Sequence, residues 1–181
     1  QVSDRYGYSL SFDQGRSYHH AYGALKLPTP FDETMAYQKR DGSVRLFART
    51  SVGEIAESTS FDRCRTWTEA KKTGLPNANT RLFVARTPSG RVLLINNDDA
   101  KVRRSMTVYL SDDDGATWPH RRLLDGRDAL SYPDADFYQG RIYLTYDRER
   151  CGAREILFAS LTEEDILHPD RPIDLRVVSK P

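Results

Sequence analysis

Apolar and polar residues alternate over short segments of this chain, and most of these segments run into a cluster of turn-forming residues. Alternation with a period of two is typical of a strand that buries one face, and Gly, Pro and Asp clusters mark the turns between strands. Only residues 162–165, where Thr162 precedes three acidic residues, resemble the start of a helix. The pattern therefore predicts an all-β protein, with strands over residues 6–11, 34–39, 44–50, 54–60, 81–87, 92–96, 106–110, 121–124, 134–138, 142–146 and 155–161. It also predicts a return strand that ends near residue 27 and a further strand after residues 60–67.

One turn sequence occurs three times, each time directly after a predicted strand. Residues 111–118 follow the pattern Ser-x-Asp-x-Gly-x-Thr-Trp. Residues 60–67 keep the pattern but have Cys64 at the Gly position, and residues 11–18 keep Ser, Asp and Gly but end in Ser-Tyr. Short Asp and Ser side chains can bond back to turn amides, and Gly tolerates the positive φ that a tight turn needs. We call this sequence the turn motif and expect it to be structural.

The three turn motifs start at residues 11, 60 and 111, so successive copies are 49 and 51 residues apart. A repeat of about 50 residues is typical of repeat architectures, and four short strands with their turns fill such a period, as in one blade of a β-propeller. The sequence predicts the end of one blade at residues 1–27 and full blades at 33–77 and 80–128. An incomplete blade is predicted at residues 131–165, and it runs into an irregular tail. A closed propeller needs four to eight blades. We therefore expect these three and a half blades to belong to a larger ring, completed by more of the same chain or by a second chain.

Charge and composition exclude several functions. The 181 residues carry 27 basic and 26 acidic side chains, a formal net charge of +1, which leaves no field to attract nucleic acid or an anionic membrane surface. No apolar run reaches membrane-spanning length, and the two cysteines form no metal-type cluster. We predict neither a metal nor a cofactor.

The repeat plan assigns each loop to one rim of the sheets. In an up-and-down blade, the turn motif joins the third strand to the fourth, whereas the loops before the first strand and after the second lie on the opposite rim, where ligand sites gather. That rim is predicted to hold one Glu, several Arg and one Tyr, namely Glu33, Arg49, Arg81, Arg103, Arg104 and Tyr132. Arg binds carboxylates through paired, charge-assisted hydrogen bonds, and a carboxylate beside a Tyr can take its proton.

These motifs resemble the sialidase-type (Asp-box, or BNR-repeat) family of six-bladed propellers, over nearly the whole chain. The resemblance implies a retaining exo-α-sialidase-like glycoside hydrolase and a secreted or periplasmic location. It implies Tyr132 as the nucleophile, Glu33 as the residue that activates it, and Arg49 and Arg103 as ligands of the sugar carboxylate, with Arg81 as a further substrate contact. Sialidases are the Tyr-nucleophile exception among glycosidases. The family's remaining Arg and its Asp acid/base belong to blades that precede this sequence, and Pro133 follows Tyr132 where the family more usually has a small polar residue.

Other interpretations fit the same residues. Glu33 and the arginines are also typical of solvated strand ends, and Tyr132 of an aromatic that packs against a channel wall. A propeller could bind a glycan without catalysis, act on a different sugar, or serve as a scaffold for protein partners. A Glu–Tyr pair with several Arg on one rim favours the glycosidase over the scaffold.

Overall fold

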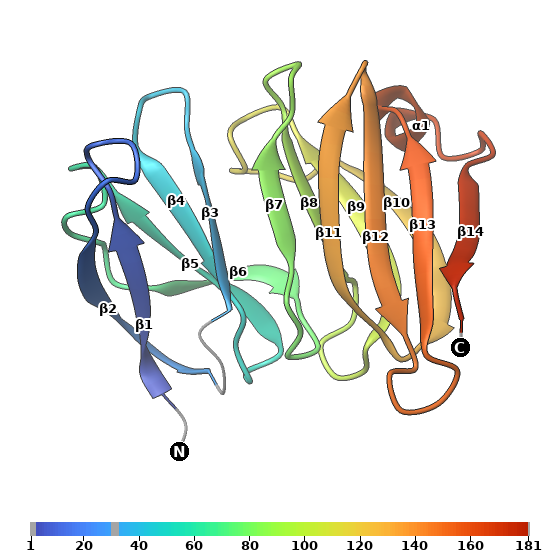
Figure 1. Cartoon of the computed structure of the whole chain (residues 1–181), viewed down its shortest axis with the longest axis horizontal. Helices are drawn as coiled ribbons and strands as arrows, with labels where there is room; N and C mark the ends of the chain where they lie inside the picture. The colour runs from blue at the N-terminus through green and yellow to red at the C-terminus, as the bar shows by residue number, and fades with distance from the viewer. Residues whose placement is uncertain (1–2, 30–32, 181) are drawn as a thin grey trace.

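The computed structural model describes residues 3–29 and 33–180, which form four antiparallel sheets that stand in a row along the chain (Figure 1). The first sheet contains two strands, β1 (Ser3–Leu10) and β2 (His19–Thr29). Each of the other three contains four strands in chain order. These strands are β3 (Thr34–Gln38), β4 (Val44–Ala48), β5 (Glu54–Ser60) and β6 (Lys71–Pro76); β7 (Phe83–Arg86), β8 (Val92–Asn97), β9 (Arg104–Ser111) and β10 (His120–Asp128); and β11 (Leu130–Tyr138), β12 (Arg141–Arg148), β13 (Glu155–Leu161) and β14 (Asp174–Ser179).

Every strand expected from the alternation is present, and one expectation about the tail is wrong. The irregular tail predicted after residue 165 contains β14, which pairs with β13 and gives the last sheet a fourth strand. Pro169 and Pro172 do interrupt the chain, but both lie before β14 begins. The short helix α1 (Glu163–Leu167) is confirmed, with Thr162 as its N-cap in a capping box with Asp165.

The turn motif closes each hairpin through its Asp. In the third copy, the Asp113 carboxylate accepts hydrogen bonds from Ser111 Oγ at 2.7 Å, Thr117 N at 2.8 Å and Thr117 Oγ1 at 2.6 Å. Asp13 and Asp62 make the same three bonds in their own copies. The bonds from the Thr or Ser at the seventh position stabilise the ionised carboxylate, so the pKa of each of the three aspartates falls to about 2.

The third turn motif also joins two sheets. The Asp114 carboxylate accepts hydrogen bonds from the backbone N of Arg40 at 2.9 Å and from Arg86 Nη2 at 2.6 Å, and its backbone O accepts one from Tyr37 Oη at 2.9 Å. A Cβ atom at Gly115, where φ is +80°, would collide with the Tyr37 hydroxyl. Gly is therefore required here by both the backbone angle and the close approach of the neighbouring sheet.

Adjacent sheets pack face to face around apolar cores. One core lies between the sheets of β3–β6 and β7–β10 and includes Phe47, Val84 and Leu94; a larger one lies between the sheets of β7–β10 and β11–β14 and includes Leu110, Leu144 and Leu157. The first strands of the three four-stranded sheets, β3, β7 and β11, neighbour one another in that order (Figure 1). They all start at the same end of the sheets, which we call the Glu33 edge; the turn motifs lie at the opposite end, the turn-motif edge. No helix in the described part of the chain is long and apolar enough to cross a membrane.

We expect Asp113→Ala to lower the free energy of unfolding by about 1–3 kcal/mol at pH 7, because three donors lose a charged acceptor. The folded-state pKa of Asp113 is lowered to about 2 from a usual value of 3.8. Its contribution is therefore full above about pH 4 and is lost as the pH falls through 2. Urea denaturation at pH 7 and at pH 2.5 measures both effects, with the exposed Asp170→Ala as the control. A gap between wild type and Asp113→Ala that widens at pH 2.5 would contradict this assignment.

Candidate active site

Glu33 is the centre of a polar cluster at the Glu33 edge. It stands immediately before β3, and its Oε1 accepts a hydrogen bond of 2.5 Å from the Tyr132 hydroxyl, which comes from β11, two sheets away. Its other carboxylate oxygen, Oε2, binds Arg49 Nη1, and Arg49 also donates to the Tyr132 hydroxyl at 3.4 Å. The structure thus brings together the three residues that the sequence predicts as activator, carboxylate ligand and nucleophile.

Arg49 is fixed on all sides. It follows β4, only 2 % of its surface is exposed, and its Nε donates to Asn79 Oδ1 at 2.8 Å. Its backbone N also donates to the backbone O of Glu33, which joins the two residues a second time. A guanidinium this deeply buried needs a nearby carboxylate, and Glu33, whose side chain keeps 24 % of its surface exposed, supplies it.

Tyr132 is pushed out of its strand by a β-bulge. Ser131 pairs with Asp147 and Asp134 pairs with Thr145, so two residues of β11 face one residue of β12. Tyr132 occupies the left-handed region, with φ at +56°, which is uncommon for an aromatic residue. Pro133, the second bulge residue, has no N–H to contribute to the ladder, so its presence fits this position. The bulge directs the Tyr132 side chain toward Glu33, two sheets away.

Arg103 lies beside this group with an incompletely neutralised charge. It precedes β9 and donates from Nη2 to the backbone O of Asn79 at 3.0 Å. Among the described residues no carboxylate lies within ion-pair distance of it. Burial and the nearby charge of Arg49 both lower the pKa of Arg103, against the opposing influence of Tyr132 and Asp147. An anion that entered the site would relieve this repulsion.

The electrostatics keep Glu33 ionised. Burial alone would raise its pKa, but the hydrogen bonds from Tyr132 and Arg49 and the charges of Arg49 and Arg103 outweigh burial and hold the pKa below its usual value of 4.5. An ionised Glu33 can accept the proton that Tyr132 must lose to become a nucleophile. The cluster has the parts for proton transfer from Tyr132 and for binding an anion near it.

Three residues of the site were missed by sequence reasoning. Asn79, in the loop before β7, uses its side chain for Arg49 and its backbone O for Arg103. Arg150, in the loop after β12, places its guanidinium 3.8 Å from the centre of the Tyr132 ring. Asp147 holds Arg150 through an ion pair and accepts a 2.5 Å hydrogen bond from Ser131. Asp147 and Arg150 belong to the strand and loop facing the bulge, so only knowledge of the bulge points to them.

Arg81 and Arg104 bind acidic residues rather than the Glu33–Tyr132 pair. Arg81 Nη2 lies 3.6 Å from Asp134 Oδ2, and Arg104 Nε lies 2.7 Å from Asp99 Oδ2, both with exposed surface. The contact between Arg81 and the substrate stays a prediction. Within the described residues, no group of three or more His, Cys, Asp or Glu side chains is placed to hold a metal ion.

Residues 8–144 match the protein family described as BNR repeat-like domain. An intramolecular trans-sialidase from Ruminococcus gnavus, bound to oseltamivir carboxylate, has a similar structure, with a TM-score of 0.75, 18% identity, and coverage of 88% of this chain and 38% of that one. The NanB sialidase from Streptococcus pneumoniae has a TM-score of 0.74 and 19% identity, with coverage of 92% of this chain and 28% of that one. The Hadza microbial sialidase Hz136 has a TM-score of 0.67 and 26% identity, with coverage of 86% of this chain and 32% of that one. No curated protein sequence matches the chain. The chain therefore shares its fold with sialidases and spans about a third of their length.

We expect Arg49→Met to lower the free energy of unfolding by about 3 kcal/mol, because Glu33 loses its buried cation; the partial exposure of Glu33 keeps the loss at the lower end for such pairs. Arg81→Met, which removes an exposed pair, is the matched control and should cost less than about 1 kcal/mol. The double variant Glu33→Gln/Arg49→Met should recover part of the loss. Urea denaturation measures the free energy of unfolding of each variant. Equal losses from Arg49→Met and Arg81→Met would show that the buried Arg49–Glu33 pair stabilises the fold no more than an exposed pair does.

Proposed function

We propose that this chain, which belongs to the BNR repeat-like domain family, carries the nucleophile half of the active site of a retaining sialidase-type glycoside hydrolase. The observation that carries the proposal is the hydrogen bond from the Tyr132 hydroxyl to Glu33, built from two sheets and surrounded by arginines. The similarity of the fold to sialidases is independent support for this assignment, because that similarity extends over most of the chain and does not depend on Tyr132 and Glu33 alone.

In the proposed reaction, Tyr132 attacks the anomeric carbon of a sugar that carries a carboxylate. The phenol proton passes to Glu33, the bond from the anomeric carbon to the departing oxygen breaks as that oxygen takes a proton from a general acid, and the glycosyl group is left on Tyr132. Water then attacks the anomeric carbon and gives its proton to the conjugate base of that acid, while the bond to Tyr132 breaks and the proton on Glu33 returns to the phenol oxygen, with net retention of configuration. Arg49 donates hydrogen bonds to both Glu33 and Tyr132. It therefore stabilises the negative charge that the Glu33 carboxylate and the Tyr132 phenol oxygen share while the proton is transferred.

Arg103 is the proposed ligand of the sugar carboxylate. Three guanidinium groups, those of Arg49, Arg103 and Arg150, face two carboxylates, those of Glu33 and Asp147, so the cluster keeps one positive charge. That charge favours a monoanionic sugar such as a sialic acid over a neutral sugar, which would leave the three arginines repelling one another. Arg81 is a second proposed contact, at the exposed margin of the site.

The four sheets are proposed to be consecutive blades of a six-bladed propeller, and the general acid is proposed to lie on another blade. Within the described residues, both carboxylates of the site are already engaged: Glu33 with Arg49 and Tyr132, and Asp147 with Ser131 and Arg150. General acid assistance contributes about 10²–10⁴-fold to such reactions. We therefore expect the 181-residue chain alone to bind sialic acid but not to turn over an unactivated sialoside.

A substrate with a good leaving group tests the nucleophile without the general acid. A 2,3-difluoro derivative of sialic acid loses fluoride from C2 without protonation, while the phenol proton goes to Glu33 and the bond between Tyr132 Oη and C2 forms. We expect peptide mass spectrometry to find the glycosyl adduct on Tyr132 in the wild-type chain and none in Tyr132→Phe. Arg103→Met should form the adduct at least about tenfold more slowly, because it loses a charge-assisted pair.

Arg104→Met is the matched control, since Arg104 adjoins Arg103 but binds Asp99 at the surface; adduct formation should be unchanged. Sialic acid binding without any adduct on Tyr132 would favour the alternative, a non-catalytic carbohydrate-binding propeller. Absence of both binding and adduct, in a chain shown to be folded, would contradict the proposed site. An adduct formed only with a fluoride of a different sugar would keep the mechanism and discard sialic acid.

A further inference from the structure

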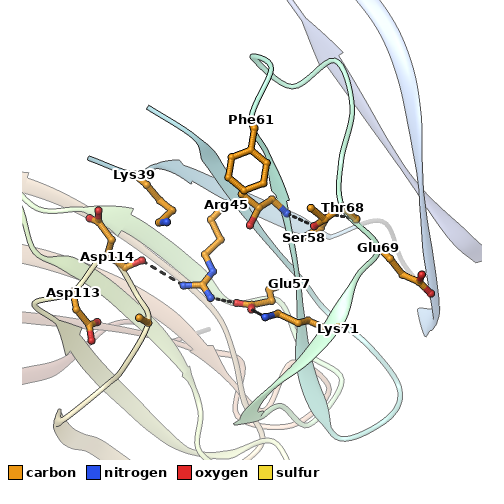
Figure 2. Close-up of a pocket in the computed structure, with 12 residues that line it drawn as sticks. Lys39, Arg45, Glu57, Ser58, Phe61, Thr68, Glu69, Lys71, Asp113 and Asp114 are labelled. Atoms are coloured by element: carbon orange, nitrogen blue, oxygen red, sulfur yellow. Dashed lines mark hydrogen bonds and ion pairs between the residues drawn. The ribbon is translucent and has the colours of Figure 1, made fainter. Parts of the chain in front are cut away.

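A groove of about 410 Å³ opens on the turn-motif edge, away from the Glu33 cluster. It lies between the sheet of β3–β6 and the third turn motif, and Lys39, Arg45, Glu57 and Asp113 are among its lining residues (Figure 2). A second hollow of about 340 Å³, lined partly by Trp118, shares Arg45, Glu57, Lys71 and Ala116 with the first. The two hollows therefore form one elongated groove between neighbouring sheets.

The floor of the groove is a polar chain of ion pairs. Glu57 is almost completely buried, and its two carboxylate oxygens bind Arg45 Nη2 and, at 3.2 Å, Lys71 Nζ, as Figure 2 shows. Arg45 Nη1 also donates to the backbone O of Gly115 at 2.7 Å. These groups hold one another in place and retain further donor and acceptor capacity, since each ammonium has three donors and each carboxylate about four acceptor sites.

Several charged groups along the groove have partners within the protein. Lys39 lies 3.3 Å from Asp41, Asp113 is bound within its turn motif, and Asp114 is bound by Arg40 and Arg86. This contrasts with Arg103 at the Glu33 edge, for which residues 3–29 and 33–180 supply no carboxylate within ion-pair distance. Arg45 and Lys71 are both paired with Glu57, and a neutral ligand rich in hydroxyl groups can donate to and accept from these residues without breaking those pairs.

An aromatic ring stands at the rim. Phe61, the second residue of the second turn motif, is 74 % exposed, and its ring lies above the groove in Figure 2. Its neighbours Ser60 and Asp62 are fixed by the hydrogen bonds of that motif, so the backbone that presents the ring is held firmly. Phe12 occupies the same place in the first motif, but the Arg65 guanidinium covers its ring at 5.5 Å. Among the described residues Phe61 has no such cover.

We propose that this groove is a second carbohydrate site, which binds a neutral oligosaccharide with one sugar ring stacked on Phe61 and hydroxyl groups bonded to Lys71, Glu57 and Arg45. A flat apolar ring beside a polar trough matches a sugar, which has an apolar C–H face and a polar rim. The elongated shape suits several linked sugars rather than one. The proposal is independent of the chemistry at Tyr132, because the two sites lie at opposite edges of the sheets.

An extended peptide is the competing occupant, because β6 is the outer strand of its sheet and lies along the groove. A peptide would use the backbone of β6 and would not need Phe61. The saccharide is favoured because Phe61 lines the same groove as the polar groups of Glu57 and Lys71, and because Lys71 and Lys72 crowd the strand edge with charge.

The test is a titration of the 15N-labelled chain with lactose, N-acetyllactosamine and cellotetraose, followed by NMR. We expect at least one of these sugars to shift the amide signals of residues 57–61 and 69–71 and to bind Phe61→Ala about tenfold more weakly than wild type. Phe61→Tyr should retain the affinity, since it keeps the ring. Phe12→Ala is the matched control and should bind as wild type does, as should Tyr132→Phe.

Each other outcome overturns the proposal. No shift with any neutral sugar at millimolar concentration would remove the site, and equal binding by Phe61→Ala and wild type would remove the stacking that defines it. Shifts at residues 33, 49, 103 and 132 in place of the groove would assign the sugar to the Glu33 edge. Binding of an uncharged extended peptide along β6, with no sugar binding, would assign the groove to proteins. None of these results bears on adduct formation at Tyr132, so the two proposals fail separately.

Discussion

The hydrogen bonds that each turn-motif aspartate accepts are the interaction on which the rest of this structure depends. They return the chain at the same end of each sheet that contains a motif, and they therefore decide which loops face the opposite edge. The third motif does more, because Asp114 ties it to the backbone of Arg40 on the neighbouring sheet and to Arg86 of its own sheet. Once the turns are fixed on one edge, the chain must present the loops before β3, β7 and β11 on the other, where Glu33, Asn79 and the Tyr132 bulge lie.

At that edge one carboxylate, that of Glu33, has two roles. Glu33 neutralises a buried Arg49 and also accepts the hydrogen bond of Tyr132, so the same group stabilises the fold and prepares the proposed nucleophile. Arg103 has no carboxylate partner in the part of the chain that the structure describes, and its pKa is lowered by burial and by Arg49. Asn79 and Asp147 bind the surrounding arginines, and the resulting excess of positive charge supports the proposal that the site binds an anion.

The sequence was sufficient to predict the strands, the turn motifs and the meeting of Glu33, Arg49 and Tyr132, because a repeat of known strand number determines the edge on which each loop lies. It did not predict β14, because the Pro residues near 170 indicated an irregular tail although pairing with β13 extends the sheet beyond them. Asn79, Asp147 and Arg150 were missed for a different reason. Their roles arise from the bulge at Tyr132 and from contacts between loops of different sheets, and neither has a local sequence signal. The ion pair of Arg81 with Asp134 is likewise a contact between sheets.

The central claim is that Tyr132 and Glu33 face a sugar whose carboxylate is bound by Arg103. The most direct measurement is a crystal structure of the chain with sialic acid. The account predicts the sugar carboxylate on the Arg103 guanidinium and the anomeric carbon about 3–3.5 Å from the Tyr132 hydroxyl oxygen, which is the separation of reacting atoms in a productive complex. A carboxylate bound away from Arg103, or a sugar whose anomeric carbon points away from Tyr132, would contradict it.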